Sequence, residues 1–436
     1  MRHYIITSFS ALLFALPGAI SAQTNPSDSL SLSQVISQTM TNYPSVKKAE
    51  IEIESANARI GLARTAYNPN LDLSGSYSHL GPTSSITLPG LGTFNLFPAD
   101  NYSAAFNLNQ QLYDFGKTKK NIDLEEQNKA LSQLTLEQLK QRLSSSILGN
   151  YYAIVYLQEA IQIKNDELKN LNEHLVFVEK KAATGSATQY EILTTKVRIS
   201  NIENQKTDLL TSLQIQTSQL NSFLGQTQTT AIRLRQELAS PQLIAETSSL
   251  IAKAYDQRDE LRITHQRSLI SESRMKVVDA QNNAILNAFA SGGFKNGYTP
   301  ELGTFKANYV VGVGFKVPIL DGKRSKYNRM QVKDEMRSVQ QDEELTRRNI
   351  SNEIIECKAN LDAAGKKIAQ TELQYKQASQ AYALAQTSYK AGVITNLDLL
   401  DSSTALSESS LSVTKAHIDY TVSLLRLKIA LGERIY

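Results

Sequence analysis

Residues that could carry out chemistry are widely scattered in this chain of 436 residues. Metal sites and many active sites need histidine, cysteine or carboxylate side chains at short, regular spacings. The histidines form no i, i+4 pair and the single cysteine matches no zinc spacing; beyond His3 near the start of the chain, these residues are His79, His174, His265, His417 and Cys357. The sequence therefore predicts no catalytic, metal or cofactor site, and we expect a protein that is not an enzyme.

Acidic residues occur instead in a short motif that the chain contains twice. The stretches AATGSATQYEILTTK (182–196) and YKAGVITNLDLLDSS (389–403) each place a glycine, then small and polar residues, then an acid among leucine and isoleucine. In the second stretch Asp398 and Asp401 are three residues apart, so they share one face of a helix. Such a pair is usually a solvated helix surface.

The recurring motif belongs to a longer internal repeat. Gly185 and Gly392 are 207 residues apart, and the same shift aligns LYDFGK (112–117) with ILDGKR (319–324). A weaker match further upstream has a shift of 215. Several anchors at one shift indicate a duplicated unit. We therefore predict two structural repeats with the order helix, β-hairpin, long helix, tip turn and helix, at 23–240 and 241–436.

Each repeat carries the pattern of a long helix. An apolar residue recurs every seven positions from Ile147 to Ala182 and again from Ile354 to Tyr389. A seven-residue period held over this length predicts a left-handed coiled-coil seam. The first long helix would be roughly 100 Å long, more than the diameter of a compact domain. The expected helices before and after the two glycine tips include 117–183, 189–224 and 397–431.

Four other segments alternate with a period of two. They are LDLSGSYSH (71–79), NYSAAFNLN (101–109), ILNAFASGGF (285–294) and NYVVGVGFKVPI (308–319). Strands of about ten residues that are apolar on one side and polar or small on the other fit a transmembrane β-barrel. A soluble sheet that caps the helices would show the same alternation. The proline- and glycine-rich segments between these strands are expected to be two hairpin loops.

Four strands are too few to close a barrel. An open sheet edge in lipid leaves backbone groups unpaired, at a cost of several kcal/mol for each group. If the strands span a membrane, several chains must therefore share one barrel. Two chains would give eight strands with a filled interior, and three would give twelve strands with room for a lumen.

The first 22 residues differ in composition from the rest. A basic start, the apolar run YIITSFSALLFAL and a final group of small residues are typical of a secretory signal peptide, predicted here at 1–22. The apolar run is shorter than the ~20 residues that a membrane-spanning helix needs. The net charge of +4 is small for this length and gives no case for nucleic-acid binding. We therefore expect an exported protein with no nucleic-acid partner.

These features together resemble the TolC family of outer-membrane efflux proteins. The resemblance covers essentially the whole chain after the leader and is strongest in YKAGVITNLDLLDSSTAL (389–406), with VPILDGKR (317–324) and a terminal ALG (430–432). It implies a mainly α fold with a β-barrel part. In that fold three identical chains build an α-barrel of long coiled-coil helices, which is continuous with a shared transmembrane β-barrel of twelve strands, four from each chain.

The resemblance also implies a location, partners and a function. The chain would lie in outer-membrane lipid and extend its helical barrel into the periplasm. There it would meet a periplasmic adaptor protein linked to an inner-membrane pump of RND or ABC type. The implied function is a passive exit duct of a tripartite efflux or type I secretion system. The alternative is a non-channel structural coiled-coil protein of the periplasm or cell surface, which the alternating strands disfavour.

Residue roles follow from the same resemblance. The repeated turns correspond to the two helical tips at the periplasmic mouth, where the adaptor would dock; the tip residues are Gly185, Ser186, Ala187, Gly392 and Val393. Asp398 and Asp401 match the two acids of the family's constricting ring. We expect these acids to make the pore cation-selective and their repulsion to raise the pKa of some of the carboxyl groups.

The gate region departs from the best-known pattern of the family. Some members hold the mouth closed with an arginine that pairs with an acid on the other tip. Here Ile394 occupies the position of that arginine, while Glu191 occupies the position of the acid, so this ion pair cannot form. We expect closure to depend on apolar contact at Ile394, or on Lys181 or Lys390 as a different base.

Overall fold

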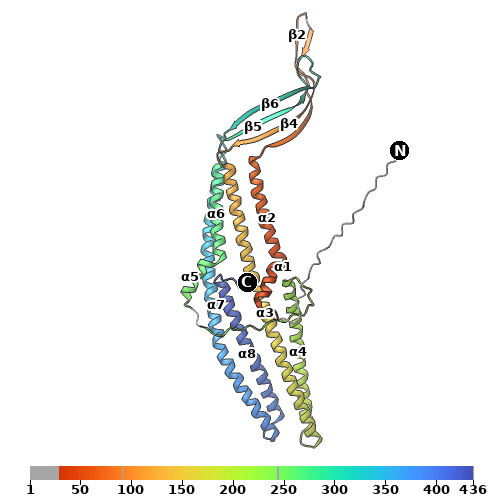
Figure 1. The fold of residues 1–436 in the computed structure, drawn as a ribbon, viewed down its shortest axis with the longest axis vertical. Coiled ribbons are helices and arrows are strands. Elements are labelled where there is room, and N and C mark those ends of the chain that lie inside the picture. Colours follow the sequence, from red (N-terminus) through yellow and green to blue (C-terminus); the bar gives the residue numbers. More distant parts are fainter. Residues whose placement is uncertain (1–28, 91, 243–244, 436) are drawn as a thin grey trace, which may run out of the picture.

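The computed structural model describes residues 29–90, 92–242 and 245–435. The predicted signal peptide, 1–22, lies outside these residues. The molecule is elongated, with a curved β-sheet at one end and two helical hairpins at the other (Figure 1). Within the described part of the chain, no helix combines the length and the apolar character needed to cross a membrane.

The two halves of the chain contain the same order of main elements. The first half has α1 (Leu32–Asn42), α2 (Pro44–Arg64), the short 3-10 helix η1 (Thr65–Tyr67), β1 (Asn70–His79), β2 (Ser85–Leu88), β3 (Gly92–Asn95), β4 (Asp100–Tyr113), α3 (Lys117–Ala183) and α4 (Gln189–Leu224). The second half has α5 (Thr247–Gln257), α6 (Asp259–Ala280), β5 (Ile285–Lys295), β6 (Lys306–Lys316), α7 (Arg324–Lys390) and α8 (Asn396–Ala430).

The long helices confirm the predicted helical pattern. Both α3 and α7 have 67 residues, and their first residues are separated by the shift of the sequence repeat. The expected coiled-coil seam is buried where the helices pack most closely, since Ile147, Ile154 and Ile354 have no exposed surface. Tyr375 on the same seam is 42% exposed in the single chain. The seam is therefore buried near the middle of the molecule and at Tyr389 by the tip, and it is more exposed between them.

The sheet confirms the four predicted strands. Their order is β1-β4-β5-β6 and all pairs are antiparallel, so β1 and β6 are the edges. Opposite residues share a face, and Val311 lines up across the sheet with Ala290 and Leu108. The neighbouring row, which faces the other way, contains Val310, Ser291 and Asn107. Among the described residues, none of the four strands contributes to the buried core.

Details of the strands differ from the sequence-based expectation. The first hairpin loop contains a second, two-stranded sheet of β2 and β3, in which Thr87 and Thr93 lie opposite each other and their hydroxyls are 2.9 Å apart. The strand expected to reach Ile319 ends at Lys316. Pro318 explains the early end, because proline has no backbone N–H for the ladder.

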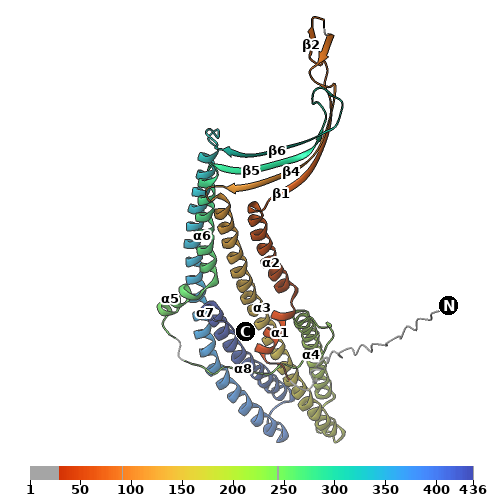
Figure 2. The ribbon, with the colours of Figure 1, turned by 45° about the horizontal axis from the view of Figure 1, so that its top comes forward.

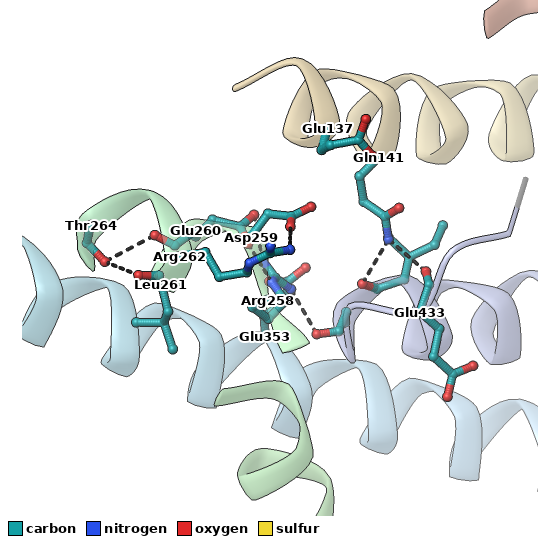
Figure 3. Close-up of polar contacts among 12 residues, drawn as sticks. Glu137, Gln141, Arg258, Asp259, Glu260, Leu261, Arg262, Thr264, Glu353 and Glu433 are labelled. Atoms are coloured by element: carbon teal, nitrogen blue, oxygen red, sulfur yellow. Dashed lines mark hydrogen bonds and ion pairs between the residues drawn. The ribbon is translucent and has the colours of Figure 1, made fainter. Parts of the chain in front are cut away.

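A polar network joins the C-terminal segment to the middle of the helical region (Figure 3). The guanidinium of Arg258 contacts the carboxylates of Glu260 and Glu353 at 2.8 Å each. It also donates to the carbonyl of Ala430, near the end of α8, at 2.9 Å. From α3, the amide of Gln141 donates to the carbonyl of Glu433 at 2.9 Å. Helices α3, α6, α7 and the end of α8 are thus tied together at one level.

Candidate functional site at the helical tips

The two helical hairpins end in turns of the same geometry. Gly185 and Gly392 have φ values of +74° and +77°, in the left-handed region that favours glycine. In each turn the residue after the glycine donates its backbone N–H to a carbonyl five residues back, from Ser186 at 2.8 Å and from Val393 at 2.9 Å. This bond is the long bond of a Schellman motif. The glycines are therefore required by the way the helices end.

The acids that follow the glycines begin the next helices. Glu191 and Asp398 each complete a capping box, with Thr188 and Thr395 as the N-cap residues. In such a box the N-cap hydroxyl accepts from the backbone of the third helical residue, whose side chain accepts from the N-cap backbone. The equal spacing of glycine and acid in the two motifs is therefore explained by equal helix starts.

The carboxylate of Glu191 also joins the two tips. The hydroxyl of Tyr389, at the end of α7, donates to Glu191 Oε2 at 2.8 Å. Tyr389 is only 4% exposed, and burial together with this hydrogen bond raises its pKa. The ammonium of Lys181 lies over the Tyr389 ring, 4.8 Å from its centre. Glu191 therefore has a neutral partner within its own chain, and the ammonium of Lys181 contacts the aromatic ring.

A buried amide makes a second link between the hairpins. Asn396, the first residue of α8, donates to the backbone carbonyl of Glu191 and to the hydroxyl of Thr195, at 3.3 Å each. Its Oδ1 accepts from the Nε2 of His174 at 2.6 Å. Burial lowers the pKa of His174, despite the hydrogen bond to Asn396. The imidazole is therefore held in its neutral form between α3 and α8.

The other predicted tip residues occupy several positions. Gly185, Ser186, Gly392 and Val393 are exposed and Ala187 is half-buried, so a partner could reach the turns. Ile394 is half-buried and packs on the apolar tip cluster around Val178, Ile192 and Leu399. The structure thus brings Glu191 and Ile394 into one cluster, whereas the exposed turn residues lie at its end.

The two predicted ring acids have partners within the chain. Asp401 pairs with Arg198 of α4, with 3.0 Å between the guanidinium and the carboxylate. The hydroxyl and backbone N–H of Thr395 lower the pKa of Asp398. Within one chain the pKa shift of Asp398 is therefore opposite to the rise expected from the sequence, because hydrogen bonds stabilise its charged form.

Sequence reasoning missed Tyr389 and Asn396 as contacts between hairpins. Tyr389 was assigned to the coiled-coil seam, and Asn396 was read only as part of the repeated motif. Their partner Glu191 is 198 residues from Tyr389 in the sequence, so no local spacing could reveal the contact. The capping boxes were detectable, because TQYE and TNLD both fit the Thr-x-x-acid pattern. Among the described residues, no group of three or more histidines, cysteines or acids could hold a metal ion.

The long helical hairpins, the exposed two-faced sheet and the duplicated order of elements define an outer-membrane channel protein. A family model described as "Outer membrane efflux protein" matches residues 35–226 and 250–433. The chain belongs to this family.

Relatives and solved structures agree with this assignment. The chain is 21% identical to "Outer membrane protein TolC" of Vibrio cholerae, over 99% of this chain and 96% of the relative. The fold resembles the crystal structure of VceC from Vibrio cholerae, with a TM-score of 0.73, 19% identity and coverage of 93% of this chain and 97% of VceC. It also resembles CmeC of Campylobacter jejuni, with a TM-score of 0.75, 15% identity and coverage of 98% and 93%.

The predicted channel function and location are thereby confirmed. The protein is an outer-membrane exit channel of the efflux class, and its helical region extends into the periplasm. The family is one of transport channels whose members work with adaptors and inner-membrane pumps. The structural coiled-coil alternative does not account for this family membership.

Proposed function

We propose that three copies of the chain form one passive exit duct. The observation that carries this proposal is the open four-stranded sheet, whose edges β1 and β6 have no strand partner among the described residues. Pairing β6 of each copy with β1 of the next would give every backbone group a partner and leave no edge in lipid. Four strands from each of three copies give the twelve-stranded barrel that the sequence resemblance implies.

The helical tips would dock a periplasmic adaptor. Small residues at the turns let a partner's backbone approach closely, and exposed Val393 offers an apolar contact. The adaptor would connect the duct to an inner-membrane pump of RND or ABC type. The docking residues proposed are Gly185, Ser186, Ala187, Gly392 and Val393.

The inner side of the tips would form the gate and the constriction. Glu191, with its hydrogen bond to Tyr389, and half-buried Ile394 would hold the two hairpins together in the closed mouth. A threefold axis would bring the carboxylates of Asp398 and Asp401 from all copies around one opening. A ring of acids of this kind favours the passage and binding of cations.

We also propose that the chain is a duplicated unit, with repeats at 23–240 and 241–436. The matching order of α2, β1, β4, α3 and α4 with α6, β5, β6, α7 and α8 supports this division. In the trimer, each repeat would contribute one β-hairpin to the barrel and one helical hairpin to the periplasmic part.

Membrane fractionation followed by unheated gel electrophoresis tests the assembly. The expected product is a detergent-extracted trimer in the outer-membrane fraction that dissociates to a single chain on heating. A planar bilayer should then show a channel at the conductance of a wide pore. A monomer that is released without detergent would contradict the proposed trimeric duct and would favour a structural role for the protein.

A further inference from the structure

The turn between β6 and α7 presents two large apolar side chains to the outside. Ile319 is 91% exposed and Leu320 is 93% exposed. Val313 and Phe315 are exposed on the apolar side of β6, and the exposed Val317 and Ile319 continue the same i, i+2 spacing in the segment that follows the strand. An exposed apolar surface of this kind marks a contact with another molecule or with a membrane.

Basic residues follow this turn and also the equivalent turn between β4 and α3. Six of them lie at the two strand-to-helix junctions and have no side-chain hydrogen bond or ion pair within the described part of the chain; they are Lys117, Lys119, Lys120, Lys323, Arg324 and Lys326. We call these six residues, with Ile319 and Leu320, the junction collar. Its positive charge is therefore available to an external partner.

The two acids at the junctions form no ion pair with the collar, and its six basic residues outnumber them. Asp114 accepts from the backbone N–H of Thr118 at 2.6 Å and is 4% exposed. Asp321 accepts from the backbone N–H of Ser325 at 2.9 Å. Each carboxylate thus accepts from a backbone N–H in the first turn of the helix that follows it, where it is also favoured by the helix dipole.

The two junctions are held at one level. After α6, the amide of Asn282 donates to the carboxylate of Asp321 at 2.9 Å. The amide of the next residue, Asn283, donates to the carbonyl of Phe115 at 2.9 Å. In Figure 2 the strands β4, β5 and β6 meet the ends of α3, α6 and α7 side by side at this level. The basic residues of both junctions therefore form one band below the sheet.

We propose that the junction collar binds anionic phospholipid headgroups of the periplasmic leaflet. The proposal rests on the outer-membrane location of the protein. Ile319 and Leu320 would enter the acyl-chain boundary as a continuation of the apolar strand face, and the lysines and arginine would contact the phosphates. Clustered basic residues beside a membrane-spanning segment attract anionic lipid in this way. In the proposed trimer the neighbouring copy would bring its β1 and the end of its α2 beside β6, and the labelling experiment below distinguishes that contact from lipid.

Lipid selectivity tests the charged half of the collar. The full-length protein is placed in nanodiscs made from equal parts of phosphatidylglycerol and phosphatidylcholine, and the lipids retained by the purified assembly are quantified. The native chain should retain more phosphatidylglycerol than the bulk mixture contains, and high salt should weaken this enrichment by screening. The triple variant Lys323→Gln, Arg324→Gln and Lys326→Gln removes half of the collar's positive charge and should lose most of this enrichment.

A matched control removes three charges from the same helix, far from the membrane. Lys366→Gln, Lys367→Gln and Lys376→Gln change exposed residues of α7 and should keep the enrichment. Both triple variants should keep their assembly and single-channel conductance, so a loss of lipid selectivity is separable from a failure of the channel. Enrichment that survives in the collar variant, or that is lost equally in the control, would overturn the proposal.

A spin label tests the apolar half. Ile319→Cys is made together with Cys357→Ser and labelled in the reconstituted assembly. Burial in lipid should make the label accessible to oxygen and inaccessible to a water-soluble nickel complex. A label shielded from both reagents would show that a neighbouring copy covers the turn, and a label open to the nickel complex would show that the turn lies in water. Either result would exclude insertion of the turn into lipid.

Discussion

At the scale of single residues, the hydrogen bond from Tyr389 can be removed by deleting its hydroxyl while the aromatic ring stays in place. It donates to Glu191 Oε2 at 2.8 Å from a position that is 4% exposed. A hydrogen bond to a charged group contributes about 1.5–3 kcal/mol. We therefore expect Tyr389→Phe to raise the resting conductance in a planar bilayer, and Glu191→Gln to do so to a smaller extent.

Double substitution tests whether these two residues act as one link. The combined Tyr389→Phe and Glu191→Gln variant should conduct no more than Tyr389→Phe alone, because both changes weaken the same hydrogen bond. Additive increases would show that the residues act separately. Ile394→Ala should have a smaller effect than Tyr389→Phe, because the half-buried Ile394 makes only apolar contacts in the tip cluster.

Lowering the pH should weaken the packing between the two helical hairpins at the tip, because it protonates His174. Burial and the nearby ammonium of Lys181 lower its pKa from the usual 6.5, against the opposing influence of Asn396 and Glu191. When the two hairpins separate at the tip, His174 is exposed to water and binds a proton more readily than it does in the packed tip. The closed tip is thus fully stable above about pH 6.5 and loses stability as the pH falls through that value toward the lower pKa of the packed imidazole.

Conductance at two pH values measures this effect. Lowering the pH from about 7.5 to about 5.5 should raise the resting conductance of the native channel. The variant His174→Gln keeps an N–H donor for Asn396 but has no titrating group in this range, so its response should be much smaller. An equal response in both channels would assign the pH dependence to another group.

The acids of α8 should determine ion selectivity. In the proposed trimer, replacing Asp398 and Asp401 with asparagine removes every carboxylate of the constriction but keeps a side-chain acceptor for the Thr395 cap. The double variant should lose its preference for cations and its block by multivalent cations added from the periplasmic side. Reversal potentials and titrated block in planar bilayers measure both. Unchanged selectivity in an intact trimer would show that Asp398 and Asp401 lie on a solvated helix surface and do not line the constriction.

At the scale of elements, two neighbouring valines of β6 give a matched test of the sheet. Val311 lies in an apolar row with Ala290 and Leu108, and Val310 lies in a polar row with Ser291 and Asn107. An arginine on the lipid face near the midplane costs about 2–4 kcal/mol. Val311→Arg should therefore reduce the yield of trimer in the outer membrane, whereas Val310→Arg should be mild.

Gly312 is a less suitable position for the polar-side substitution than Val310. Gly312 also lies on the polar side, but a Cβ at this position would approach the ring of Phe289 to 2.6 Å. Gly312→Ser would therefore disturb packing as well as polarity. Equal yields of the Val310→Arg and Val311→Arg trimers would indicate that both faces of the sheet meet water.

The sequence predicts the helices and strands more accurately than it predicts the contacts between them. The period of seven and the period of two are local signals, so α3 and the four main strands were found near their observed bounds. The β2–β3 hairpin was missed because its strands have four residues each, too few for a clear alternation. The bonds of Tyr389 and Asn396 join hairpins that are distant in sequence, and only the folded chain brings them together.

At the scale of the whole molecule, the two tip turns should act as one docking surface. Ser186 and Val393 are exposed at equivalent positions of the two hairpins. Ser186→Trp and Val393→Trp should each block close approach of an adaptor and abolish export, while trimers remain intact on unheated gels. Export measured in cells with the full pump complex checks the first effect. Normal export by both variants would place the adaptor elsewhere on the helices.

The equal lengths of α3 and α7 have a consequence for changes of chain length. Each has 67 residues between the junction at the sheet and its tip. At about 1.5 Å per residue, deleting seven residues from only one of them would raise its tip by about 10 Å and leave the other in place. The two helices therefore set the same distance between the sheet and each tip. A functional channel that reaches a different depth in the periplasm would need the same deletion or insertion in both halves of the gene, together with matching changes in the returning helices.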